Sequence, residues 1–130
     1  AQSLRDHLMP LMDRAVSALI EDLAVRGLLE ETLVVLTGEF GRTPRHNANG
    51  GRDHWGSAFS LAMAGGGVRA GVVHGASDRL GAYPREGQVL PQDIAATIFH
   101  LLGIAPSTEV HDTLGRPIAA CRGNVIRQIV

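Results

Sequence analysis

The stretch TLVVLTG at residues 32–38 sets four consecutive aliphatic residues between two threonines and closes on a glycine. A short apolar run with β-branched residues is typical of a strand that is covered on both faces. Such a strand needs helices on two sides of its sheet. The stretch therefore predicts a layered α/β domain.

The segment ahead of this strand, residues 3–27, carries leucine and alanine at steps of three and four. This spacing predicts an amphipathic helix. Ser3 and Asp6 match a capping box at its start. Pro10 either kinks the helix or restarts it as a first-turn residue, because proline lacks a backbone donor. A helix that leads by a short loop into a strand indicates one step of a three-layer sheet.

Three further elements are predicted after the first strand. AFSLAMAGG (58–66) and GVVHGA (71–76) indicate a second and a short third strand, and LPQDIAATIFHLLG (90–103) indicates a second helix. Asp93, near the start of that helix, is suited to accept from free backbone donors. These elements fall short of the mean sheet of about five or six strands. They indicate part of a larger α/β domain, with a compact small fold as the alternative.

The composition fits one soluble globular domain over residues 1–130. Because 12 basic and 13 acidic residues nearly balance, no global field favours nucleic acid or an acidic membrane. No stretch reaches the roughly 18 to 20 apolar residues of a membrane span. Cys121, the single cysteine, has no partner in the chain for a disulfide.

A polar segment, TGEFGRTPRHNANGGRDHWG (37–56), follows the first strand. Ligands in open α/β sheets bind beyond the carboxyl ends of strands, which is where Glu39 falls. Arg42 can hold a phosphate or sulfate through two parallel hydrogen bonds. Asp53 and His54 offer the oxygen and nitrogen that transition metals prefer. From these residues alone, Glu39 could equally pair with Arg42 or cap a helix, and His54 could be a surface residue.

Two other features have simple structural interpretations. Trp55 is predicted to be a packing anchor beside the polar segment. AGGGVRAG (64–71) is predicted to be a tight turn, because it lacks the Lys-Ser/Thr that a phosphate-binding loop requires.

Four stretches together resemble a bacterial sulfatase-like family of unknown function, domain of unknown function fifteen-oh-one, within the alkaline phosphatase/sulfatase superfamily. They are RGLLEETLVVLTGEFGRTP, GRDHW, AGGGVRAG and DIAATIFHLLGI, and they span nearly the whole chain. The resemblance implies the C-terminal part of an alkaline-phosphatase-like three-layer α/β/α domain with a mostly parallel sheet. It further implies two divalent metals at the sheet edge, hydrolysis of phosphate or sulfate esters, and a periplasmic or exported location.

The superfamily pattern assigns roles to residues of the polar segment. Glu39 and Phe40 take the place of a strand-end Asp-His pair, and His54 takes that of a later histidine. The resemblance implies that Glu39 and His54 bind a divalent metal (Zn, Mn, Ca or Mg). It implies that Arg42 neutralises charge on the transferred group, and that Asp53 binds metal or orients the imidazole of His54. Because Phe40 cannot bind metal, one of the two metal sites lacks its histidine.

Two hypotheses of function follow from this resemblance. The first is the C-terminal segment of a metal-dependent hydrolase that acts on a small anionic phosphate or sulfate ester. Its nucleophile and remaining ligands would then lie ahead of Ala1, so this chain alone would lack a complete active site. The alternative is a degenerate, non-catalytic relative that binds a ligand or partner, which the residue Phe40 favours. Apolar faces that the chain cannot cover itself would also allow a homo-oligomer.

Overall fold

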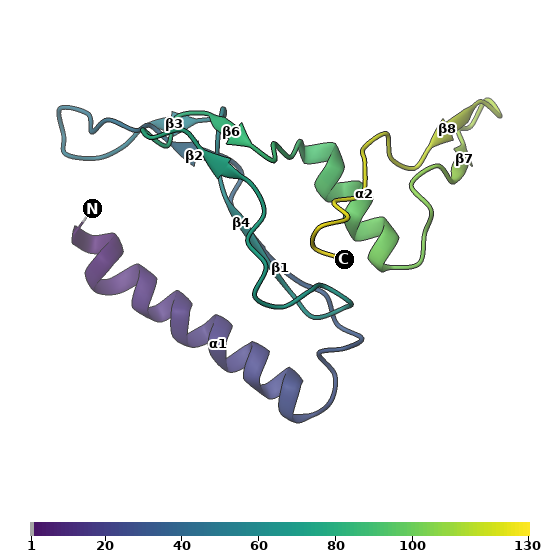
Figure 1. Cartoon of the computed structure of the whole chain (residues 1–130), viewed down its shortest axis with the longest axis horizontal. Helices are drawn as coiled ribbons and strands as arrows, with labels where there is room; N and C mark the ends of the chain where they lie inside the picture. The colour runs from purple at the N-terminus through teal and green to yellow at the C-terminus, as the bar shows by residue number, and fades with distance from the viewer. Residues whose placement is uncertain (1) are drawn as a thin grey trace.

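The computed structural model describes residues 2–130, which form two helical segments and eight short strands (Figure 1). The helical elements are η1 (Leu4–Leu8), α1 (Met9–Val25) and α2 (Pro91–Leu101). The strands are β1 (Val34–Thr37), β2 (Gly41–Arg42), β3 (His54–Trp55), β4 (Leu61–Ala64), β5 (Ala76–Ser77), β6 (Pro84–Glu86), β7 (Glu109–His111) and β8 (Pro117–Ala119). The mixed helix and strand content confirms the α/β class in its coarse sense.

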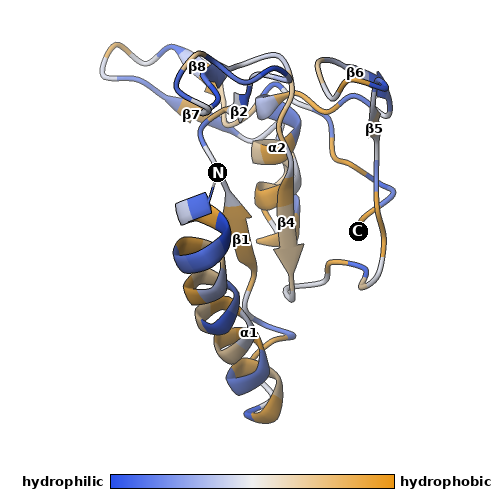
Figure 2. Cartoon of the chain, turned by 90° about the vertical axis from the view of Figure 1, so that its left-hand side faces the viewer, coloured by the Kyte–Doolittle hydropathy of each residue, from blue (hydrophilic) through white to orange (hydrophobic). Residues whose placement is uncertain are grey.

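Within residues 2–130 the strands pair in twos, and every pair is antiparallel. The longest pair joins β1 to β4 from Val34↔Ala64 to Thr37↔Leu61. Both strands are apolar and lie side by side (Figure 2). Their direction follows from the connection between them, which is a folded β2–β3 ribbon and not the crossover helix that a parallel pair needs. The predicted mostly parallel sheet therefore does not occur in the described part of the chain.

The predicted strands are confirmed to different degrees. β1 and β4 fall within the segments 32–38 and 58–66 that the sequence indicates. The third prediction, 71–76, is wrong over most of its length, because only Ala76 of that segment joins a strand. The side chain of Val73 is instead 91% exposed. The tight turn predicted for AGGGVRAG is present, and the N–H of Val68 donates to the carbonyl of Gly65 at 3.0 Å.

The first helix begins differently from the prediction. Ser3 has helical backbone angles and makes no side-chain capping bond, so the capping box is wrong. The carboxylate of Asp6 instead accepts from the side chain of Arg5 at 2.7 Å. Residues 4–8 form a π-helical turn, and α1 starts at Met9 with Pro10 in its first turn. The helix is continuous through this junction, because Leu8 keeps helical backbone angles and the N–H of Met9 donates to the carbonyl of Leu4, so Pro10 does not restart it.

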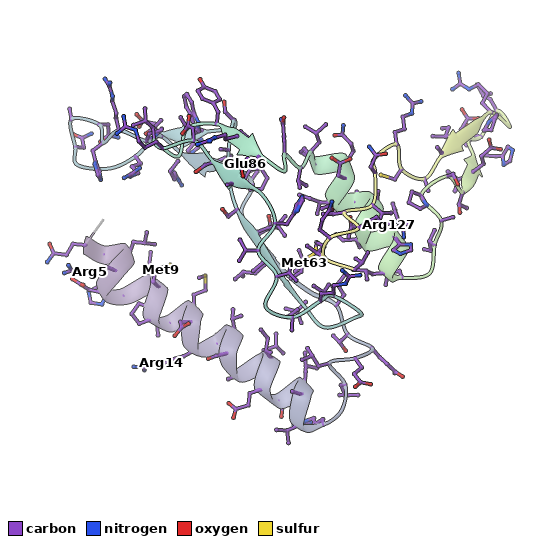
Figure 3. The ribbon with its side chains drawn as sticks, viewed as in Figure 1. Arg5, Met9, Arg14, Met63, Glu86 and Arg127 are labelled. Atoms are coloured by element: carbon purple, nitrogen blue, oxygen red, sulfur yellow. The ribbon has the colours of Figure 1, made fainter. Side chains whose placement is uncertain are left out.

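α1 runs beside the β1–β4 ribbon without burying any of its residues (Figure 1). Its apolar stripe stays open, and the side chains of Leu8 and Leu11 are 58% and 64% exposed. The side chains of Arg5 and Arg14 extend from the helix formed by η1 and α1 into solvent (Figure 3). α1 therefore presents an amphipathic face that no other element within residues 2–130 covers.

The accessible surface area of the chain is large because elements such as α1 leave their residues uncovered. The chain exposes 9656 Å², whereas a folded monomer of its mass exposes about 6,600 Å². In the described part of the chain only four residues are buried, namely Ala82, Ala96, Thr97 and Ile126. The excess of about 3,000 Å² is comparable to the area that large stable interfaces bury. The chain thus exposes far more surface than a compact monomer of its mass.

The small core lies between α2 and the C-terminal segment. Thr97 is fully buried, and its hydroxyl donates to the carbonyl of Asp93 at 2.7 Å and accepts from the N–H of Ile126 at 3.0 Å. The N–H of Arg69 donates to the carbonyl of Ile129 at 2.8 Å, which ties the same segment to the turn after β4. The C-terminal segment is therefore the link between α2 and the β1–β4 ribbon.

Thr97→Val is expected to destabilise the chain by about 1–3 kcal/mol, because it leaves the buried N–H of Ile126 without an acceptor. Urea unfolding followed by circular dichroism measures this loss. Thr113→Val, at an exposed position, is the matched control and should leave the midpoint unchanged. Equal midpoints for the two variants would contradict the role given to the Thr97 hydroxyl.

Asp93 confirms the prediction for the start of α2, because its carboxylate accepts from the backbone N–H groups of Asn124 (2.8 Å) and Leu90 (2.9 Å). These bonds, that of Asn124 first, lower the pKa of the Asp93 carboxyl below its ordinary value. A carboxyl whose pKa is lower in the folded state stabilises the fold above its unfolded pKa. That stability is lost as the pH falls through the folded pKa.

Asp93→Asn is therefore expected to reduce stability near neutral pH and to flatten its decline below about pH 4. Urea unfolding at about pH 7 and about pH 3 measures both effects. Asp13→Asn, which removes an exposed carboxylate of α1, should keep the decline of the unsubstituted chain. A decline that is as steep in Asp93→Asn as in that control would rule out this contribution.

Candidate functional site

The polar segment after β1 is organised by the β2–β3 ribbon. Arg42 and His54 are direct cross-strand partners, and Gly41 pairs with Trp55. Side chains of direct partners lie on the same face of an antiparallel ribbon, with Cβ atoms about 5 Å apart. The ribbon thus sets a guanidinium beside an imidazole, although the two residues are far apart in sequence.

An aromatic ring completes this arrangement. The ring of Phe40 lies 3.9 Å from that of His54 between centroids, at an interplanar angle of 31°. The guanidinium carbon of Arg42 lies 5.5 Å from the Phe40 centroid, within the range of a cation–π contact. Phe40 therefore covers one face of the imidazole. The ring nitrogens lie in the ring plane, and His54 as a whole is exposed.

Glu39 directly precedes Phe40, so its backbone lies close to this cluster. Its side chain is exposed and takes part in no ion pair found in residues 2–130. The guanidinium of Arg42 donates instead to the carbonyl of Arg52 at 3.3 Å. The sequence alternative of a Glu39–Arg42 pair is therefore not formed, and the carboxylate remains available to a ligand.

Asp53 forms hydrogen bonds with residues of its own loop and not with the adjacent His54. Its carboxylate accepts from the side-chain amide of Asn47 at 2.8 Å, and its N–H donates to the hydroxyl of Thr43 at 3.1 Å. Asp53 lies directly before β3, at the end of the loop, and its carboxylate is bound by Asn47. Among the described residues no hydrogen bond joins Asp53 to His54. In this structure Asp53 fixes the loop that positions His54, in place of orienting the imidazole directly.

Two contacts fix the ribbon in the fold. The indole N–H of Trp55 donates to the carbonyl of Ala82 at 2.6 Å, and its ring meets that of Tyr83 edge-on at 5.6 Å. Gly41 lies so close to the chain that a Cβ there would overlap the carbonyl oxygen of Ala58. Trp55 is thus the packing anchor that the sequence predicts, and Gly41 permits the close approach of the backbone.

A comparison with known protein families places the chain. The family model described as "Protein of unknown function (DUF1501)" matches residues 2–130. The chain belongs to the DUF1501 family. No match was found among curated proteins or among solved structures.

The donor groups of this DUF1501 chain do not form a metal centre by themselves. Across residues 2–130, no group of three or more His, Cys, Asp and Glu side chains is placed to hold a metal ion. A structural or catalytic zinc site uses at least three protein ligands. Glu39 and His54 could contribute two at most, so the set they offer is incomplete.

Some features of this DUF1501 site were missed by sequence reasoning. Asn47 was not singled out, yet its side chain holds Asp53 and its Oδ1 accepts from the N–H groups of Asn49 and Gly51. The signal for such a turn is present in the sequence, since asparagine at the first position and glycine at the fourth, here Asn47 and Gly50, favour a β-turn. Phe40 was considered only as a lost ligand, whereas the structure makes it the stacking partner of His54.

A helix must be long and apolar to span a membrane. None of the helices in residues 2–130 combines the length and the apolar character needed to cross a bilayer.

Proposed function

We propose that this chain is the C-terminal segment of a metal-dependent hydrolase of phosphate or sulfate esters. The observation that supports this best is the cross-strand pair of Arg42 and His54 on one face of the β2–β3 ribbon. An anionic ester needs a fixed positive group, and hydrolysis of such esters commonly uses metal-bound nitrogen ligands. The ribbon brings one residue of each kind together, and the exposed Glu39 adds an oxygen donor nearby.

Each residue has a definite part in the proposed site. The guanidinium of Arg42 binds two oxygens of the transferred group and stabilises the negative charge that develops on them. Glu39 and His54 supply one oxygen and one nitrogen toward a divalent cation, and the parent protein supplies the other ligands and the nucleophile. Asp53, through Asn47, keeps the loop from moving the imidazole.

The larger domain that we propose is a three-layer α/β/α sandwich of the alkaline phosphatase type. Among the described residues β1 pairs with β4 on one edge and with no strand on the other, so that free edge can accept a strand of a mostly parallel sheet. The open stripe of α1 can cover one face of that sheet. The excess of about 3,000 Å² of exposed surface supports an incomplete domain of this kind.

A second candidate is a non-catalytic relative that binds an anionic ligand. The position of Phe40 favours it, because this residue takes the place of a metal-binding histidine and packs on His54 at 3.9 Å. In that case Arg42 would bind the anionic ligand, and the ligand would not be hydrolysed.

The test is hydrolysis of p-nitrophenyl phosphate and p-nitrophenyl sulfate by the full-length parent protein, before and after treatment with a chelator. The hydrolase proposal predicts release of nitrophenol from one of the esters, its loss after chelation, and its return with Zn²⁺ or Mn²⁺. Binding of phosphate or sulfate without turnover under any metal would favour the second candidate. Neither turnover nor binding would rule out both.

A further inference from the structure

The β7–β8 hairpin projects beyond α2 on the opposite side of the molecule from α1 (Figure 1). Its strands pair as Glu109↔Ala119, Val110↔Ile118 and His111↔Pro117. All three residues of β7 are exposed, and the side chains of Val110 and Ile118 are 53% and 45% exposed. The hairpin therefore carries an apolar cross-strand pair that the described part of the chain leaves about half exposed.

The two outer edges of this hairpin differ in their hydrogen-bonding groups. The N–H of Ala120 donates to the carbonyl of Thr108 at 2.7 Å, and that of Asp112 to the carbonyl of Arg116 at 3.1 Å. Because hydrogen-bonded pairs alternate along an antiparallel ladder, Glu109 and His111 direct their N–H and C=O groups away from β8. β7 thus offers a complete outer edge.

The outer edge of β8 is weaker. Its outward groups belong to Pro117 and Ala119, and Pro117 has no N–H to donate. Proline on an edge strand is a common way to prevent further pairing. The hairpin is therefore blocked on the β8 side and open on the β7 side.

We propose that β7 pairs with β7 of a second copy of this chain, antiparallel and with the two-fold axis at Val110. In that register Glu109 lies opposite His111 of the second copy, and these are the residues whose backbone groups point outward. Each such pair exchanges two N–H···O=C bonds. The two hairpins then form one four-stranded sheet through an isologous contact.

The side chains support a second copy as the occupant. The carboxylate of Glu109 meets the imidazole of His111 from the other chain on one face of the sheet, where an imidazole N–H can donate to it. On the other face, Val110 and Ile118 of both copies form an apolar cluster. The β7 edge is therefore complementary to itself in backbone groups, side-chain hydrogen bonding and apolar surface.

Val110→Cys in a Cys121→Ser background tests the register. A non-hydrogen-bonded antiparallel pair places its Cα atoms about 4.5 Å apart, within the range that a disulfide spans. We expect mild oxidation of the purified chain to give a disulfide-linked dimer on a non-reducing gel. Val73→Cys in the same background is the control for random collision, because this side chain is 91% exposed in a loop. Equal oxidation of the two variants, or none in Val110→Cys, would overturn the proposal.

A matched pair of proline substitutions tests the edge. Glu109→Pro and Ala119→Pro each remove one outward N–H, the first from the β7 edge and the second from the β8 edge. Sedimentation velocity of the 130-residue chain should show at least a tenfold weaker dimer for Glu109→Pro and an unchanged dimer for Ala119→Pro. Equal effects of the two variants would overturn the proposal, as would an unsubstituted chain that stays monomeric at its highest soluble concentration.

Discussion

Arg42→Ala is expected to lower kcat of the full-length parent protein for its ester substrate by about 10²–10³-fold. The guanidinium is the fixed positive group of the proposed site, and it lies beside His54 as a cross-strand partner. Its loss leaves charge on the transferred group without a donor in the transition state. Steady-state kinetics with the preferred nitrophenyl ester measures kcat and KM separately.

Arg45→Ala is the matched control for this change. Arg45 is an exposed arginine of the same loop but lies outside the β2–β3 ribbon, so its removal should leave kcat unchanged. If both variants lost activity to the same degree, the effect would be one of general charge and not of the ribbon geometry. If neither did, Arg42 would have no part in turnover.

Gly123→Ala is expected to destabilise the chain by about 3 kcal/mol, near the upper end for an overpacked position. A Cβ at this residue would overlap the carbonyl of Gln92 and lie 2.6 Å from the backbone nitrogen of Asp93. These are backbone atoms at the start of α2, which cannot turn aside as a flexible side chain would. The urea midpoint of the purified chain measures the loss.

The control for this prediction is Gly56→Ala. A Cβ at Gly56 would point into open space, and the φ of this residue is not positive. Its substitution should therefore leave stability close to that of the unsubstituted chain. A Gly123→Ala variant as stable as Gly56→Ala would show that the C-terminal segment does not pack against α2 as described.

The elements that local signals specify were the ones that could be predicted. The apolar run at 32–38, the periodicity of 90–103 and the turn at 64–71 each depend on near neighbours in sequence, and the structure has all three. The antiparallel pairing of β1 with β4 depends instead on how the 38–60 connection folds. The same run predicts a strand covered on both faces, whereas Leu36 and Thr37 of β1 are exposed in this chain. An apolar run also does not give the direction of the partner strand.

The same difference between local and long-range determinants applies to the candidate site. The residue types of the polar segment predict a site that binds an anion and a metal. The pairing of Arg42 with His54 depends instead on the loop that the Asn47–Asp53 hydrogen bond closes. The stacking of Phe40 on His54 is likewise a long-range contact with no local signal. Sequence reasoning therefore named the side chains, while their neighbours had to come from the structure.

The most direct test of the proposed site is the metal content of the full-length parent protein by elemental analysis, with His54→Ala and His46→Ala compared. His46 is an exposed histidine of the same loop and serves as the control. We predict a bound divalent metal in the unsubstituted protein and in His46→Ala, and its loss together with ester hydrolysis in His54→Ala. A parent protein free of metal, or a His54→Ala variant that keeps both its metal and its activity, would contradict the account.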